Sequence, residues 1–212
     1  MLFSLLFSNP LQFFASVIAL IAGITVHEFS HALAAHVQGD PTPGLQGRLS
    51  LNPLRHLDPF GTLFLLFAGF GWGRPVQFDP RYLKNKRLGP LIVGLAGPAA
   101  NLAMILLFGG LMSLLFATGV LSLDNGLFVI LSALVLMNLV LMIFNLIPIP
   151  PLDGSKVLFA LLPPSANGLV SWLEQRGPML LIGLILLDAL SPVSILGRVF
   201  TALANVTFQI FL

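Results

Sequence analysis

The chain has 212 residues, of which 57% are hydrophobic and only 8% carry a charge. Soluble domains contain about 25% charged residues, so this composition excludes an ordinary soluble enzyme and predicts an integral membrane protein. Seven of the ten basic residues lie between positions 47 and 88, which is typical of a cytoplasm-facing loop and does not favour a nucleic-acid surface. The sequence has no cysteine, so disulfides and thiolate metal sites are excluded.

The first long apolar run, residues 11–37, is long enough to cross a bilayer and contains the pattern His27-Glu28-x-x-His31. Histidines four residues apart lie on one face of a helix, so both imidazoles can bind one zinc ion. Glu28, beside the first histidine, can then act as general base toward a zinc-bound water. In a soluble protein this pattern is also compatible with a surface helix. Here the flanks are apolar, and charged groups in such a helix are costly unless they are satisfied, so we predict a functional site.

Two shorter segments follow the first apolar run. Residues 44–59 alternate apolar and polar positions and contain Gly and Pro, which predicts a short strand or a membrane-associated β-hairpin. We expect this segment against the site, where its edge can pair with an extended substrate; an interfacial loop without substrate contact is the alternative. Residues 60–70 are apolar but too few to span, which predicts a short re-entrant helix.

The rest of the chain is dominated by apolar runs at 88–123, 126–147, 168–190 and 193–212. Together with the first run they predict an all-α protein of about five transmembrane helices, folded as one domain with a catalytic core at about 11–163 and C-terminal helices at 168–212. Asn101 is the only strong hydrogen-bonding side chain on its stretch, so it should face protein or a cavity and not lipid.

Catalytic zinc usually has three protein ligands and one open position, so the two histidines need a partner. Asp153 follows a proline-rich run and is our preferred ligand, although a helix N-cap is the simpler role. His36 lies about 180° around the helix from His27 and points away. His56 and Asp58 remain candidates. If the basic loop is cytoplasmic, the next two spans go out and return, which brings Asp153 to the same membrane side as the histidine pair.

These motifs resemble those of the site-2 proteases, which are intramembrane zinc metalloproteases. The family's His-Glu-x-x-His, Gly-Pro-x-x-Asn and Asn-x-x-Pro-x-Pro-x-Leu-Asp-Gly elements are matched by His27, Glu28, His31, Gly97, Pro98, Asn101, Asn145, Pro148, Pro150, Leu152, Asp153 and Gly154. The resemblance implies that Asp153 completes the zinc site and that Asn101 and Asn145 lie near the substrate path. It also supports the hairpin. Many relatives carry an added PDZ or CBS domain, but no soluble-looking segment of this sequence is long enough for one, so we expect a minimal member of the family.

The sequence therefore predicts a protease that binds Zn²⁺ through His27, His31 and Asp153, uses Glu28 as general base, and cleaves a membrane-protein substrate in or next to a transmembrane segment. Asn101 or Asn145 would donate hydrogen bonds to the oxyanion or the substrate backbone. We expect a multi-pass protein of the plasma membrane, in contact with the lipid bilayer, with the site toward the cytoplasm. The alternatives are a metal-ion transporter, which normally shows polar residues on several spans and often a repeat, and a non-catalytic metal-binding protein, against which the intact Glu28 argues.

Overall fold

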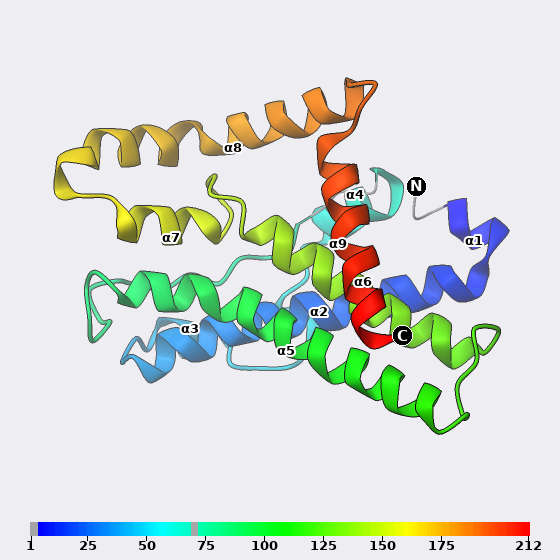
Figure 1. Ribbon diagram of the computed structural model, residues 1–212. Coiled ribbons are helices and arrows are strands. Elements are labelled where there is room, and N and C mark those ends of the chain that lie inside the picture. The colour runs from blue at the N-terminus through cyan, green and yellow to red at the C-terminus, as the bar shows by residue number, and fades with distance from the viewer. Residues whose placement is uncertain (1–3, 69–71) are drawn as a thin grey trace.

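The computed structural model describes residues 4–68 and 72–212. Within these residues the regular structure is helical (Figure 1). In chain order the helices are α1 (Leu5–Ser8), α2 (Pro10–Val37), α3 (Thr42–Leu45), η2 (Pro53–Arg55), α4 (Pro59–Ala68), α5 (Gly89–Ala117), α6 (Gly126–Asn145), α7 (Gly154–Leu161), η3 (Pro164–Ala166), α8 (Asn167–Leu190) and α9 (Ile195–Phe211). The short helix predicted at 60–70 is confirmed as α4 up to residue 68; residues 69 and 70 lie outside the described part.

Helices α2, α5 and α6 pack together and form the centre of the molecule (Figure 1). The start of α2 is set by Asn9, whose side chain accepts a hydrogen bond from the Gln12 amide, and by Pro10 in the first turn. The helix ends just before Gly39, which has φ +106° and adopts a backbone conformation that favours glycine.

Helices α2 and α5 each bury a row of residues spaced four apart. The rows are Ala15, Ala19, Gly23, His27, His31 and Ala35 on α2, and Gly89, Val93, Gly97, Asn101, Ile105 and Gly109 on α5. Residues four apart share one helix face, and small residues there let helix backbones approach closely. At Gly23, for example, a Cβ atom would lie only 2.7 Å from Leu141 Cδ1 of α6. The two histidines therefore lie on the face that packs against the neighbouring helices.

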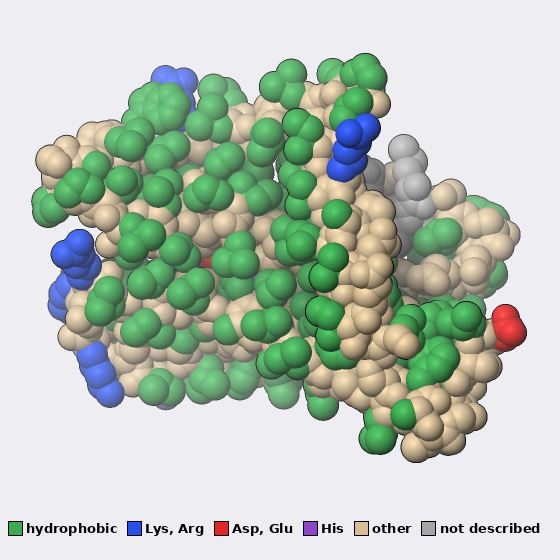
Figure 2. Space-filling model, viewed as in Figure 1, with side chains coloured by type: hydrophobic (Ala, Val, Ile, Leu, Met, Phe, Trp, Pro, Cys, Tyr) green, Lys and Arg blue, Asp and Glu red, His purple; other side chains and the backbone are tan. Residues whose placement is uncertain are grey.

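Among residues 4–68 and 72–212, four helices are long and apolar enough to cross a membrane: α2, α5, α6 and the segment 164–190 that contains α8. Hydrophobic side chains cover the face seen in Figure 2, and Lys and Arg side chains gather at its left edge, where α2 ends and α5 begins. The C-terminal end of α6 lies on this same side of the bundle (Figure 1). The chain is thus a multi-pass integral membrane protein, and the C-terminal end of α2, which carries the histidines, and that of α6, which leads to Asp153, lie on one side.

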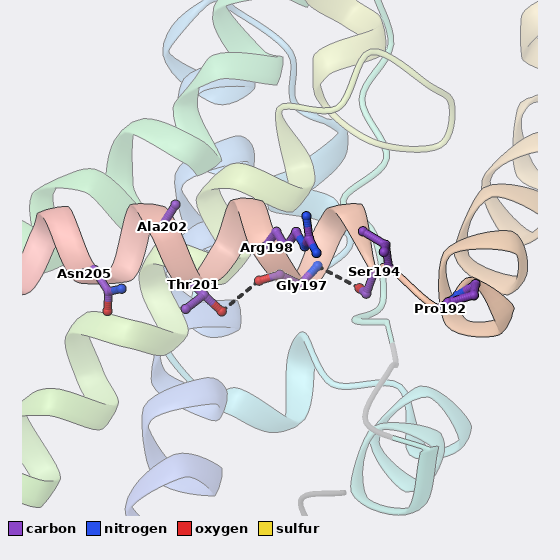
Figure 3. A pocket seen from close by; sticks show the side chains of 8 residues that line it. Pro192, Ser194, Gly197, Arg198, Thr201, Ala202 and Asn205 are labelled. Atoms are coloured by element: carbon purple, nitrogen blue, oxygen red, sulfur yellow. Dashed lines mark hydrogen bonds between the residues drawn. The ribbon is translucent and has the colours of Figure 1, made fainter.

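The predicted span at 193–212 is not among these four helices. Helix α9 has 17 residues, about 25 Å of helix and shorter than the ~30 Å of a bilayer core. It crosses α5 and α6 (Figure 1), where Ala204, Phe208 and Phe211 pack on their apolar side chains. A surface pocket lies along α9 (Figure 3) and is lined by no histidine or acidic residue; its Thr201 and Asn205 point to the same side. The run 193–212 thus forms a helix with one face packed on α5 and α6 and another face that carries polar side chains.

The predicted β-hairpin at 44–59 is not confirmed. This segment consists of the end of α3, a turn at Gly47 with φ +67°, and the 3-10 helix η2, which Asn52 caps. The described residues contain a single isolated β-bridge, which pairs Leu57 with Gly73. Alternation alone predicted a strand, but proline at the start of η2 and the capping side chain of Asn52 favour a helical turn instead.

The buried Arg48 connects this segment to residues 74 and 75. Its guanidinium donates hydrogen bonds to the carbonyl oxygens of Arg55, of Arg74 at 3.1 Å, and of Pro75 at 3.4 Å. A charged donor that satisfies three backbone acceptors is a strong local constraint. Residues 72–76 are thereby positioned beside α2, near Glu28.

Candidate metal centre

Three buried side chains converge at one point between α2 and the start of α7. The Nε2 atoms of His27 and His31 and the Oδ2 atom of Asp153 lie 3.0 Å from one another in all three pairings. Within the described part of the chain, these residues form the one group of three or more His, Asp or Glu side chains able to hold a metal ion. The structure thus brings together the three residues that the sequence proposed as ligands.

The far side of each of these groups has a hydrogen-bond partner. His31 Nδ1 lies 2.6 Å from the Val93 carbonyl oxygen, and His27 Nδ1 lies 2.6 Å from Asn101 Oδ1. Both oxygens are acceptors, so each Nδ1 carries the proton and each Nε2 is left with a lone pair. The second carboxylate oxygen of Asp153, Oδ1, accepts a hydrogen bond from Lys156 Nζ at 2.7 Å. Three lone pairs that face one another at 3.0 Å repel unless a cation lies between them.

This donor set fits zinc. Nitrogen ligands 2.0–2.1 Å from a tetrahedral zinc lie about 3.3 Å apart, which is close to the observed Nε2–Nε2 distance of 3.0 Å. The site is also walled by a residue without a side chain: a Cβ atom at Gly97 would lie 2.5 Å from His31 Nε2 and 2.6 Å from His27 Nε2. That position is near metal–ligand distance from both nitrogens, so only glycine leaves space for an ion.

The loop between α6 and α7 positions Asp153. A Cβ atom at Gly154 would lie 2.2 Å from the Leu146 carbonyl oxygen, so glycine is required for the loop to fold back tightly onto the end of α6. Asp153 occupies the N-cap position of α7, but its side chain makes no capping hydrogen bond. Asp153 therefore lies at the N-cap position, as the simpler interpretation expected, but its carboxylate faces the two histidines instead of capping the helix.

A cavity of about 350 Å³ opens beside the three groups. Its polar lining comprises His27, Glu28, His31, Thr62, Asn145, Asp153 and Lys156, and its walls include Ile24, Trp72, Val76, Leu141 and Phe144. Glu28 Oε2 accepts a hydrogen bond from the Val76 amide at 3.0 Å. The carboxylate is therefore held by backbone at the edge of the cavity, one residue along the chain from His27.

The other candidate residues are placed differently. Asn145 lines the cavity, whereas Asn101 is fully buried behind His27 and is not among the residues that line it. His36 is exposed. His56 Nε2 donates to the Ser50 carbonyl oxygen at 2.6 Å, and Asp58 Oδ1 accepts from the Gly61 amide near the start of α4. The last two residues therefore have local structural contacts and do not join the metal group.

Sequence reasoning did not single out Asn138 and Lys156, and it named Gly97 only as a position of a family motif. Asn138 is fully buried and hydrogen-bonded to Asn101. The apolar run 126–147 holds two amide side chains, Asn138 and Asn145, and an amide in such a run was a usable signal, the same one that pointed to Asn101. Nothing in the sequence indicated that Gly97 faces both imidazoles or that Lys156 contacts Asp153.

Comparisons with known proteins agree with this site. The model of peptidase family M50 matches residues 109–187. A protein of Bacillus subtilis named "Putative zinc metalloprotease YwhC" is 43% identical over 76% of this chain and 75% of its own length. Proteins named "Putative zinc metalloprotease Rip2" from Mycolicibacterium smegmatis and Mycobacterium tuberculosis are each 30% identical over 86% of this chain and 72% of their own length. No solved structure matches the chain. These similarities confirm the resemblance to the site-2 proteases, and the chain belongs to peptidase family M50 and is a metalloprotease.

Proposed function

We propose that this metalloprotease is an intramembrane enzyme that uses zinc to hydrolyse peptide bonds in or next to the transmembrane segments of other proteins. The observation that carries the proposal is the triangle of His27 Nε2, His31 Nε2 and Asp153 Oδ2, with 3.0 Å sides. The triangle includes a pair of residues in the C-terminal half of the apolar helix α2 and lies beside a cavity that a carboxylate lines.

The chain's own residues have distinct roles in the proposed reaction. His27, His31 and Asp153 hold the metal, and zinc, when bound, polarises the scissile carbonyl and makes the attacking water more acidic. Glu28 takes the proton from that water and passes it to the leaving amine. Its carboxylate is already at the cavity, where the Val76 amide orients it. A carboxylate that is oriented by the backbone and lines the cavity can reach a water molecule there, as a general base must.

Asn145 is the better candidate for binding the oxyanion or the substrate backbone. Its Nδ2 donates one hydrogen bond to the Leu141 carbonyl oxygen at 3.0 Å, which leaves its second amide hydrogen for a group in the cavity. Both amide hydrogens of Asn101 point elsewhere, toward Asn138 Oδ1 at 2.8 Å and the Gly23 carbonyl oxygen at 3.4 Å. We therefore assign Asn101 a supporting role behind His27.

The substrate is proposed to be a membrane protein that enters from the bilayer side. The cavity walls are largely apolar, which suits an apolar segment. A helical substrate hides its carbonyl groups in its own hydrogen bonds, so it must unwind locally before attack. The basic residues at 48–87 favour a cytoplasmic position for this end of the bundle, in the plasma membrane.

Two substitutions test the proposal in purified protein. Glu28→Gln removes the base but no ligand, so zinc content should stay at the wild-type level while cleavage of a membrane-spanning reporter falls by about 10²–10⁴-fold. Asp153→Ala removes a ligand, so both zinc content and cleavage should fall. Thr25→Val is the matched control, because Thr25 is buried in the same helix and bonds only the Ile21 carbonyl oxygen within that helix.

The same proteins distinguish the alternatives. Metal flux into vesicles that survives Glu28→Gln, together with no reporter cleavage by the wild type, would favour a metal-ion transporter and refute the proposal. Zinc content that is unchanged in Asp153→Ala would remove Asp153 from the ligand set.

A further inference from the structure

Two asparagines from different helices meet in the interior of the bundle, directly behind the metal centre. Asn101 of α5 and Asn138 of α6 are both fully buried, and Asn101 Nδ2 donates to Asn138 Oδ1 at 2.8 Å. Amide pairs between membrane helices commonly stabilise helix packing. This pair differs from a simple interhelical contact because Asn101 also bonds a proposed zinc ligand, His27.

We propose that Asn138 is a positioning residue that acts through Asn101 to fix the tautomer of His27, so that its Nε2 lone pair faces the metal. The inference rests on the proposed metal site. It assigns Asn138 a function in ligand preparation, without any contact to substrate or metal.

The direction of the hydrogen bonds is fixed by backbone carbonyl groups, that of Leu134 for Asn138 and, at the longer distance of 3.4 Å, that of Gly23 for Asn101. Asn138 Nδ2 donates to the Leu134 carbonyl oxygen at 2.8 Å, and a carbonyl oxygen can only accept. The amide of Asn138 must therefore present its oxygen to Asn101. Asn101 must in turn present Nδ2 to Asn138 and Oδ1 to His27, 2.6 Å from Nδ1.

The last step places the proton of the imidazole. A side-chain oxygen at Nδ1 requires Nδ1 to be the donor, so the neutral ring carries its hydrogen there and leaves Nε2 unprotonated. Metal-ligating histidines generally depend on such an outer partner to set the tautomer and the ring orientation. His31 obtains the same result directly from the Val93 carbonyl oxygen, whereas His27 faces an amide that could be turned either way.

Without Asn138 this orientation keeps only the longer hydrogen bond from Asn101 Nδ2 to the Gly23 carbonyl oxygen, at 3.4 Å. Asn101 could rotate its amide by 180° and offer Nδ2 to His27, which would favour the tautomer with hydrogen on Nε2. That tautomer cannot bind a metal through Nε2. Asn138 Oδ1 itself packs close to the α2 backbone, because a Cβ atom at Gly23 would lie 3.2 Å from it.

The test uses two readouts, the tautomer in metal-free protein and the affinity for zinc. ¹⁵N-histidine-labelled protein in detergent gives ring-nitrogen chemical shifts that distinguish the tautomers, and the His27 signals are assigned by their loss in a His27→Gln variant. Wild type should show hydrogen on Nδ1 of His27. Asn138→Leu should show a mixture or the other tautomer, with zinc affinity lowered about 10–100-fold in chelator competition.

Two further variants separate positioning from packing. Asn138→Asp should retain the wild-type tautomer, because its carboxyl group accepts from Asn101 whether or not it is protonated. Thr25→Val removes the hydroxyl group of another buried residue that also donates to the carbonyl oxygen four residues earlier and has no hydrogen bond to a ligand, so it should change neither readout. If Asn138→Leu does not fold, Asn138→Ser replaces it; its hydroxyl can bond its own helix, as Ser30 does with Val26, but is one bond too short for Asn101.

The outcomes are distinct. Loss of thermal stability in Asn138→Leu or Asn138→Ser with an unchanged His27 tautomer and unchanged zinc affinity would overturn the inference and leave Asn138 as a packing residue. Failure of the wild type to bind zinc or cleave a reporter would refute the proposed function instead, while the tautomer measured without metal would still decide the role of Asn138.

Discussion

Replacing Gly97 with alanine, which adds a single methyl group, should strongly weaken metal binding. The added Cβ atom would lie 2.5 Å from His31 Nε2 and 2.6 Å from His27 Nε2 and Cε1. Non-bonded heavy atoms are most stable at about 3.5–4.0 Å, so each imidazole would have to retreat by about 1 Å. Zinc sites tolerate deviations of only about 0.2 Å. Zinc affinity should therefore fall by more than the ~10–100-fold that is typical when a ligand loses an outer partner.

The control is Gly110→Ala in the same helix, because nothing lies within 4 Å of a Cβ atom there. Alanine is favoured over glycine in a helix by about 1 kcal/mol, so this variant should keep zinc and unfold at an equal or higher temperature. Zinc content by metal analysis, chelator competition and reporter cleavage are measured on both proteins. A Gly97→Ala protein with wild-type zinc content and wild-type cleavage would refute the assignment of the metal position.

Two further substitutions test one contact beside the metal centre and one contact far from it. Lys156→Met removes the 2.7 Å hydrogen bond to Asp153 Oδ1 and should lower zinc affinity about 10–100-fold in chelator competition; equal affinity would show that Lys156 does not orient the carboxylate. Gly109→Ala would place a Cβ atom 2.4–2.6 Å from the ring of Phe211, which should displace the end of α9 and lower the free energy of unfolding by about 1–3 kcal/mol. Zinc content should not change in Gly109→Ala, and unaltered thermal unfolding would contradict the described packing of α9.

Much of the site was predictable because its key spacing is local. His27 and His31 are four residues apart, and an α-helix places such residues on one face whatever surrounds it. Because the flanking residues are apolar, charged and polar side chains there are costly unless they have partners, and this favoured a functional site. Asp153 was proposed as the third member of the group from the need for a third ligand and the direction of the spans, and the structure places its carboxylate beside the two histidines. The same residue occupies the N-cap position of α7 and belongs to the group that could hold a metal ion.

The hairpin at 44–59 and the span at 193–212 were not confirmed. Both were predicted from the local residue pattern, whereas contacts with other parts of the chain determine the structure of these segments. Alternating residues at 44–59 favoured strands, yet the segment forms helical turns that the guanidinium of Arg48 ties to residues 74 and 75. The apolar run at 193–212 favoured a span, yet α9 uses Phe208 and Phe211 to pack across α5 and α6. Composition measures how apolar a segment is and does not say whether lipid or protein covers it.

Sequence was sufficient for the membrane character, the histidine pair with its glutamate, and the family, because these follow from composition and from spacing within single helices. Only the packed structure decided that Gly97 leaves space for an ion, that Lys156 holds one oxygen of Asp153, and that Asn138 stands two hydrogen bonds behind His27. The physical reason is that helix geometry fixes the relation of neighbours along the chain, whereas residues on different helices meet through the sum of many weak packing contacts.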